Sequence, residues 1–125
     1  MLLQTVRPNI VQSIRAYRVE DLMQAAQDVS QHFLYANLTN AQSKQDVLEA
    51  LAQAFMFPAH FGKNLDALYD SLTDLEPAPG YLVLLDRMPA TSDFDVEQRD
   101  ALLEVFRDVA RYFAGTGMPF RVFYR

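Results

Sequence analysis

The sequence has 125 residues, of which 50% are hydrophobic and 22% are charged, and its formal net charge is −5. This composition fits one globular domain with a single core, and it excludes a disordered chain. The absence of cysteine excludes disulfides, thiolate metal sites and a cysteine nucleophile.

Targeting segments are not evident in the sequence. No apolar run approaches the roughly 18 residues that a membrane helix needs. The opening stretch MLLQTVRPNIVQSIR has neither a long apolar segment nor a small-residue cleavage site. We therefore expect a cytoplasmic protein that does not bind membranes.

The negative charge is concentrated in one part of the chain. Residues 60–100 contain nine acidic residues and three basic ones. Because affinity for phosphate comes from clustered Lys and Arg, this distribution disfavours nucleic acid as a partner. It favours a basic protein partner. The alternative is that acidic helices only keep a small protein soluble.

The first third of the chain predicts a strand, a helix and a strand. Residues 11–19 are β-branched and aromatic with partial alternation, which indicates an outer strand. Residues 20–31 place small and apolar side chains at spacings of three and four, as in an amphipathic helix. Residues 32–39, HFLYANLT, indicate the second strand.

Two helices follow in the middle of the chain. Ser43 is positioned to cap a helix that runs to about Phe55 and is followed by a break at Pro58. We expect Gly62 to supply backbone freedom in the tight connection. A short helix then extends over residues 64–72.

The last third predicts a strand, a long helix and a strand. Residues 81–85, YLVLL, are apolar on both faces, as expected of an inner strand covered by helices. After a polar loop, residues 95–114 repeat apolar side chains at helical spacing, and Gly115 and Gly117 are expected to end that helix. Residues 119–125 alternate as a final strand.

The predicted order is therefore β-α-β-α-α-β-α-β. Strands that alternate with helices predict an α/β fold with a small, mainly parallel sheet of three to four strands. No linker or repeat divides the chain, so we expect residues 1–125 to form a single domain.

The short helix has two chemically different sides. Its predicted core side carries the leucines Leu65, Leu68 and Leu72. Its predicted solvent side carries the polar residues Asp66, Asp70 and Thr73, with Tyr69 at the border. Two carboxylates one turn apart repel each other by a few tenths of a kcal/mol, and an arginine-rich partner would reverse the sign of that effect.

These polar and aromatic residues are also typical of binding centres. A carboxylate that meets a guanidinium at an interface contributes strongly, and tyrosine is a rigid anchor with a polar tip. Tyr69 is equally compatible with a boundary core residue, however, and Thr73 with an ordinary surface hydroxyl.

Enzymatic function has little support in the sequence. The carboxylate pair with His60 could bind a divalent metal or perform acid–base chemistry, but nothing else completes such a site. His32 lies within an apolar strand and is interpreted as an ordinary sheet residue. No phosphate-binding glycine loop, GxSxG or HExxH motif is present. We expect neither a cofactor nor a metal.

The stretch FPAHFGKNLDALYDSLTDL, residues 57–75, closely resembles the motif of the barstar family of barnase inhibitors. The resemblance continues more loosely through YLVLLD, LLEVFRD and the last strand, and so covers about residues 32–125. It implies a three-layer domain in which residues 1–31 are an additional strand and helix. It also implies an intracellular inhibitor that protects against an extracellular-type ribonuclease or a related basic nuclease toxin.

The resemblance also implies roles for individual residues. Asp70 would occupy the place of a substrate phosphate among the basic residues of the nuclease. The other implied contacts come from the loop, the short helix and the long helix: His60, Gly62, Asn64, Asp66, Tyr69, Thr73 and, as a supporting acid, Asp108.

Three departures change the surroundings of this acidic centre. His60 replaces a tyrosine, Tyr69 a tryptophan and Lys63 an acid, so the partner can be a related nuclease other than barnase. Two other functions stay open: an acidic adaptor that binds a different basic protein, and a metal-dependent hydrolase.

Overall fold

The computed structural model describes residue 3 and residues 6–125. The elements along the chain are β1 (Asn9–Ser13), α1 (Val19–Asp28), β2 (His32–Asn37), α2 (Lys44–Ala54), α3 (Leu65–Thr73), β3 (Tyr81–Asp86), α4 (Val96–Thr116) and β4 (Phe120–Tyr124). This order confirms the predicted α/β arrangement.

All four strands form one parallel sheet in the order β1-β4-β3-β2. The inner strand β3 pairs on both sides, so that Val83 lies between Leu34 of β2 and Val122 of β4. All six residues of β3 are buried. The sequence of a strand that is covered on both faces and paired on both edges is a continuous apolar run. The run YLVLL therefore predicted an inner strand correctly.

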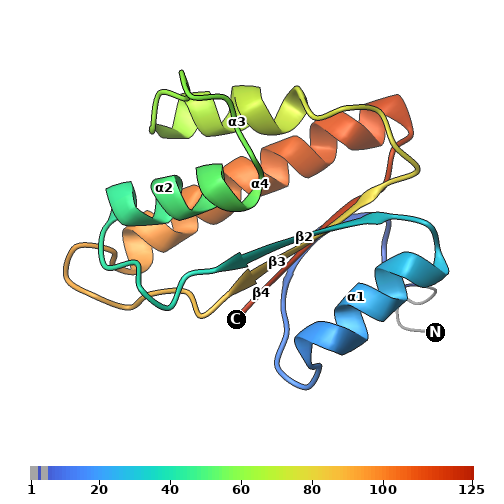
Figure 1. Ribbon diagram of the computed structural model, residues 1–125, viewed down its shortest axis with the longest axis horizontal. Helices are drawn as coiled ribbons and strands as arrows, with labels where there is room; N and C mark the ends of the chain where they lie inside the picture. The colour runs from blue at the N-terminus through green and yellow to red at the C-terminus, as the bar shows by residue number, and fades with distance from the viewer. Residues whose placement is uncertain (1–2, 4–5) are drawn as a thin grey trace.

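Helices cover both faces of the sheet and create three layers (Figure 1). On one face α2 packs on β2, α4 packs on β1 and β4, and α3 packs on α4. On the opposite face α1 lies alone, and its buried Leu22 joins a second core with Leu82, Leu84 and Phe123. The sheet therefore separates α1 from α3, as Figure 1 shows.

A buried arginine joins the N-terminal segment to the sheet. Arg121 of β4 is only 7% exposed, and its guanidinium donates to backbone oxygens of Arg7 (3.1 Å), Val6 (3.4 Å) and Leu3 (3.5 Å) and to Oε1 of Gln31 (3.2 Å). Burial lowers the pKa of Arg121 from its usual value. The cation has neutral oxygens as its partners, so it depends on the N-terminal segment to be satisfied.

Three boundary predictions in the N-terminal part and the long helix are corrected by the structure. The first strand is Asn9–Ser13 rather than 11–19, because β4 offers pairing partners only up to Tyr124. The first helix ends at Asp28, and Ser30 reverses the chain with a φ of 58° before β2. The long helix continues through Gly115 to Thr116, so that only Gly117, with a φ of 80°, ends it.

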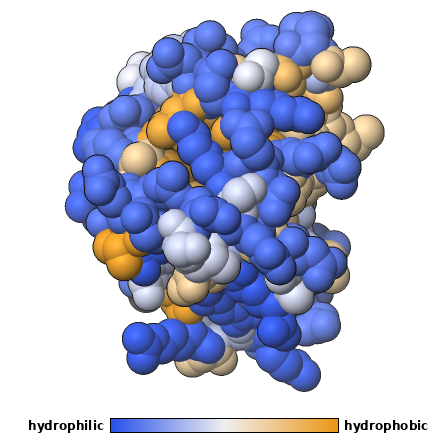
Figure 2. Space-filling model, turned by 90° about the vertical axis from the view of Figure 1, so that its left-hand side faces the viewer, coloured by the Kyte–Doolittle hydropathy of each residue, from blue (hydrophilic) through white to orange (hydrophobic). Residues whose placement is uncertain are grey.

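A polar network lies at the carboxyl end of β3. Asp86 is 6% exposed and accepts hydrogen bonds from the Tyr35 hydroxyl (2.8 Å) and Nε of Arg125 (2.9 Å). Burial acts to raise the pKa of Asp86, but the two hydrogen bonds and the cationic neighbours outweigh it and lower the pKa below its usual value. Figure 2 views the molecule from the end toward which the strands point, and the surface there is mainly hydrophilic.

Candidate partner-binding face

The helix α3 begins at a side-chain cap that also fixes the loop before it. Oδ1 of Asn64 accepts a hydrogen bond from the Ala67 amide at 2.7 Å, and Nδ2 of Asn64 donates to the Gly62 carbonyl at 3.2 Å. Such a cap satisfies one of the free amides of the first helical turn. Asn64 thus connects the loop to the start of the helix, and one N–H of its side chain makes no bond in the described part of the chain.

The prediction for Gly62 is wrong in one respect. The left-handed residue of the loop is Lys63, with a φ of 48°, whereas Gly62 is not in that region. The Lys63 carbonyl accepts from Nε2 of Gln45 at 3.3 Å, and Nζ of Lys63 lies 3.7 Å from Oε1 of Glu49. The unusual lysine of the motif therefore pairs with α2 and does not neutralise the acids of α3.

The other end of the loop is fixed by the last turn of α2. The Met56 amide donates to the Gln53 carbonyl (3.3 Å), and the Phe57 amide donates to the Ala52 carbonyl (2.9 Å). These two bonds form a Schellman motif with Met56 in the left-handed region at a φ of 57°, a position that usually carries glycine. Met56 is 88% exposed, so its side chain has no packing role.

The two sides of α3 are arranged as predicted. Leu68 and Leu72 are fully buried and Leu65 packs partly buried against the same core. Asp66 and Asp70 are exposed, and neither has a basic group within ion-pair distance in the described part of the chain. The helix therefore presents two carboxylates to solvent whose repulsion no cation of the described chain relieves.

Tyr69 and Thr73 are both partly used by the fold. Tyr69 is half-buried and packs against the main core. The Thr73 hydroxyl donates to the carbonyls of Tyr69 (2.8 Å) and Asp70 (3.2 Å), one turn back in its own helix. For a partner, Thr73 therefore has acceptor capacity left on its oxygen, and Tyr69 keeps part of its side chain accessible.

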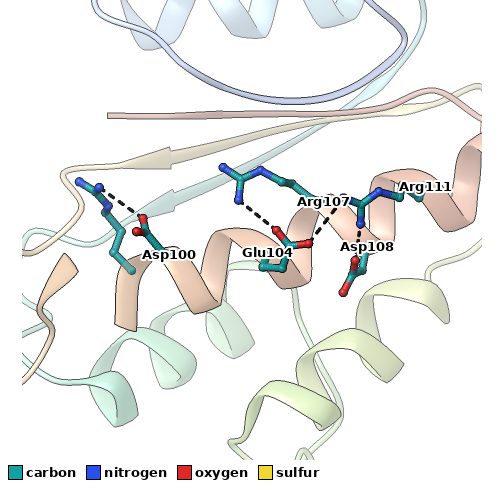
Figure 3. Close-up of polar contacts among 6 residues, drawn as sticks. Asp100, Glu104, Arg107, Asp108 and Arg111 are labelled. Atoms are coloured by element: carbon teal, nitrogen blue, oxygen red, sulfur yellow. Dashed lines mark hydrogen bonds and ion pairs between the residues drawn. The ribbon is translucent and has the colours of Figure 1, made fainter. Parts of the chain in front are cut away.

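Asp108 belongs to a line of charges on α4 (Figure 3). Arg111 pairs with Asp108 and lies 3.5 Å from Glu104, which in turn lies 3.3 Å from Arg107. In Figure 3 the Asp108 side chain points toward the side of α4 on which α3 lies. Because Arg111 already pairs with it, Asp108 is less available to a cationic partner than Asp66 or Asp70 are.

A groove that the sequence did not predict runs between the loop and α3. Its volume is about 570 Å³, and its lining includes His60 and Gly62 from the loop and Asp70 from the helix. Two further acids, Asp74 and Glu76, also line it. Asp74 follows Asp70 by one helical turn, a spacing that could have signalled a shared face.

The candidate residues thus lie in three places. Asn64 and Asp66 stand at the start of α3, as its cap and in its first turn. His60, Gly62 and Asp70 meet at the groove. Thr73 lines a hollow together with Tyr112 and Phe113 of α4, and Asp108 points toward the side of α4 on which α3 lies, whereas Tyr69 packs partly buried against the core. Of the two exposed aspartates within α3, Asp70 lines the groove and Asp66 does not.

Two other kinds of site are absent from the described residues. No group of three or more His, Cys, Asp and Glu side chains there could hold a metal ion. Within residues 3 and 6–125, no helix combines the length and the low polarity that crossing a bilayer requires.

Comparison with protein families matches residues 31–125 to Barstar, described as barstar (barnase inhibitor). No curated protein matches the chain. The match begins just before β2 and covers every element from β2 to β4, including the loop and α3. Members of this family are inhibitors rather than enzymes. The chain belongs to the barstar (barnase inhibitor) family.

Proposed function

We propose that this protein inhibits a barnase-type ribonuclease by filling its basic active site with α3 and the preceding loop. The observation that carries the proposal is the exposed, unneutralised carboxylate pair on α3, in a chain that belongs to a family of barnase inhibitors. Asp70 takes the place of a substrate phosphate. The remaining contacts come from His60, Gly62, Asn64, Asp66, Tyr69, Thr73 and Asp108.

The structure supports this mode of binding through preorganisation. The Asn64 cap and the Schellman motif at Met56 hold both ends of the loop, so binding costs less conformational entropy than it would for a loop with free ends. Asp66 and Asp70 make no ion pair within residues 3 and 6–125, so no such pair has to break before they meet a cation. Inhibition in this form is steric and electrostatic, and it requires neither a cofactor nor a chemical step.

The test is the variant Asp70→Ala against a panel of barnase-type ribonucleases in an RNA-cleavage assay. Truncation of one partner of a charge pair buried at an interface costs about 2–5 kcal/mol of affinity, a general range that the barnase–barstar complex itself helped to establish. Folding should change by less than about 0.5 kcal/mol because Asp70 is exposed. The matched control is Asp93→Ala, an exposed acid in the loop before α4.

Ionic strength gives a second readout of the same proposal. The exposed side of α3 with Asp66 and Asp70, here called the acidic face, should attract a basic ribonuclease over a distance. Salt screens this attraction, so it should slow association of the wild type and slow that of Asp70→Ala less. Normal inhibition by Asp70→Ala would overturn the mechanism. If no ribonuclease of the panel is inhibited while another basic protein binds the same face, the protein is an acidic adaptor instead.

A further inference from the structure

The strand β1 lies at one edge of the sheet, and half of its backbone groups face outward. At its start the Pro8 carbonyl accepts from an amide of β4 (2.9 Å), and at its end the Ile14 amide donates to a carbonyl of β4 (3.0 Å). Because the backbone groups of a paired strand alternate between its two sides, the even-numbered residues face β4. The N–H and C=O groups of Asn9, Val11 and Ser13 therefore point away from the sheet. No turn, loop or side-chain hydrogen bond of the described residues satisfies them.

This edge lacks the features by which sheets usually prevent further pairing. Such features are charged residues, prolines and bulges within the edge strand, or a covering element. The strand NIVQS contains no charged residue or proline, and its register with β4 is continuous, without a bulge. In the part of the chain that the structure describes, β1 pairs with β4 alone. The edge can therefore accept another strand, a common mode of peptide recognition.

A groove lies between this edge and α4. Its volume is about 480 Å³, and residues 7–11 form one wall. The other wall comes from one face of α4, where the residues are spaced three and four apart: Arg107, Ala110, Arg111 and Ala114. Nδ2 of Asn9 donates to the carbonyls of Ala110 and Met118, both at 3.0 Å. These two bonds hold the strand against the helix, so the groove is formed before a partner binds.

The charged residues that line the groove are all arginines: Arg7, Arg107 and Arg111. Arg107 and Arg111 pair with acids of α4 that do not line the groove (Figure 3). Arg7 is exposed at the start of the edge, and Arg15 is exposed just past its end. Neither makes an ion pair within residues 3 and 6–125. The edge is therefore flanked by cations that are free to meet carboxylates of a partner.

This charge favours an acidic partner over a second copy of the chain. Two β1 strands that paired antiparallel through all three outward residues would be centred on Val11. Arg7 of each copy would then lie opposite Arg15 of the other. Like charges directly opposite each other destabilise a pair of strands. An extended segment with carboxylates at alternate positions would instead direct all of them to the side on which the groove lies.

We propose that the β1 edge and the groove beside it form a second binding surface, which takes an extended acidic segment of a partner protein. The segment pairs with the backbone of Asn9, Val11 and Ser13 and adds a strand to the sheet. Its alternate carboxylates meet Arg7 and Arg107. The surface does not depend on the proposed function, because β1 precedes the residues of the family match and contributes nothing to the acidic face.

The first experiment tests strand addition with a defined peptide. The ¹⁵N-labelled full chain is titrated at low ionic strength with acetyl-Thr-Glu-Val-Glu-Val-Glu-Thr-amide. The amide signals of Asn9, Val11 and Ser13 should shift in a saturable way, and hydrogen exchange of these three amides should slow. The amides of Ile10 and Gln12 should keep their exchange rates, because they already pair with β4.

Two further peptides test the pattern and the sign of the charge. In acetyl-Thr-Glu-Glu-Glu-Val-Val-Thr-amide the composition is the same but the alternation is lost, so binding should be several-fold weaker. The peptide with lysine in place of each glutamate should not bind. Equal binding of either peptide, or binding without slower exchange at the three outward amides, would overturn the inference.

The backbone contact is tested by Ser13→Pro. This substitution removes an outward N–H at an exposed position and leaves the bonds to β4 intact, as proline on an edge strand allows. It should weaken binding of the alternating peptide about two- to tenfold, the range for one lost hydrogen bond. The matched control Ser13→Ala keeps the N–H and should bind normally. Equal urea midpoints of both variants and the wild type establish that the fold is kept.

The charge contact is tested by Arg7→Gln/Arg107→Gln. Removal of both cations should weaken the alternating peptide about two- to tenfold, as expected for two solvent-accessible ion pairs. The control Lys63→Gln/Arg87→Gln removes the same charge from exposed positions outside the groove lining and should bind normally. Equal weakening in this control would reduce the effect to net charge and overturn the inference.

Sedimentation of the free protein separates the acidic partner from a second copy. The wild type should remain monomeric over the concentrations used for the titration. A dimer that Ser13→Pro dissociates, together with no binding of the alternating peptide, would show that the edge pairs with another copy of the chain and would overturn the inference.

Discussion

Removal of residues 1–30 should leave the chain unable to fold stably, although the family match begins only at residue 31. The deletion removes β1 and α1 and uncovers Leu82, Leu84 and Phe123, which are 0%, 0% and 2% exposed. Burial of one such side chain contributes about 1.5–3 kcal/mol, so the three together account for about 5–9 kcal/mol. That approaches the whole stability of an ordinary domain, about 5–15 kcal/mol.

The buried Arg121 adds to this cost. Three of its four acceptors are backbone oxygens of residues 3, 6 and 7, which the deletion removes. A buried cation whose only remaining acceptor is Oε1 of Gln31 is strongly unfavourable, so the guanidinium would draw water into the remaining core.

Urea denaturation followed by circular dichroism, with dye binding as a probe of exposed apolar surface, measures the effect. The full chain should unfold cooperatively, and residues 31–125 should bind dye and show no cooperative transition. A truncated chain with the midpoint of the full chain would refute the reasoning. Leu22→Ala, at a fully buried position of α1, should cost about 2–5 kcal/mol in the full chain, whereas its exposed neighbour Met23→Ala should be nearly neutral.

Three further predictions concern single positions. Met56→Gly should raise the free energy of unfolding by about 0.5–1 kcal/mol, because the left-handed φ of 57° strains methionine but not glycine. Urea denaturation measures this, and a midpoint lower than that of the wild type would contradict it. Asp86→Asn should cost about 1.5–3 kcal/mol by weakening the bonds from Tyr35 and Arg125. The lowered pKa of Asp86 means that its contribution is present above pH 3.8 and is lost as the pH falls through the folded-state value, so the acid-induced loss of stability should be smaller in Asp86→Asn. Leu68→Ala should cost about 2–5 kcal/mol by thermal or urea denaturation, which Asp70→Ala should not.

The sequence alone predicted most of the architecture because the relevant signals are local. Ser43 accepts a hydrogen bond from the Asp46 amide at 3.1 Å, as its place before an apolar repeat indicated. The apolar run of β3 identified an inner strand. The final strand was predicted at its correct place, but its alternation did not indicate that four of its five residues are buried. The two sides of α3 followed from the helical period, since Leu68 and Leu72 are buried and Asp66 is exposed.

Features that depend on contacts between distant residues were not predictable. The interior position of Arg121 depends on carbonyl oxygens more than a hundred residues away along the chain. The groove depends on how the loop folds back beside α3, and its acid Glu76 lies outside every helical pattern. Gly62 was expected from its residue type to supply the backbone freedom of the loop, but the left-handed φ lies at Lys63.

The position of the N-terminal extension constrains how it can influence binding. The strand β1 extends the sheet at the β4 edge, and α1 covers the face opposite to α2, α3 and α4 (Figure 1). A partner that docks on the loop and α3 would be separated from α1 by the whole thickness of the sheet. The extension therefore leaves the acidic face open. It influences that face only indirectly, because it covers the other side of β3 and β4 and so stabilises the sheet on which α4 packs. Substitutions on the outer surface of α1, such as Met23→Ala, should then leave both stability and inhibition unchanged. Substitutions on its buried side should lower the free energy of unfolding. They should weaken inhibition only in proportion to the loss of folded protein.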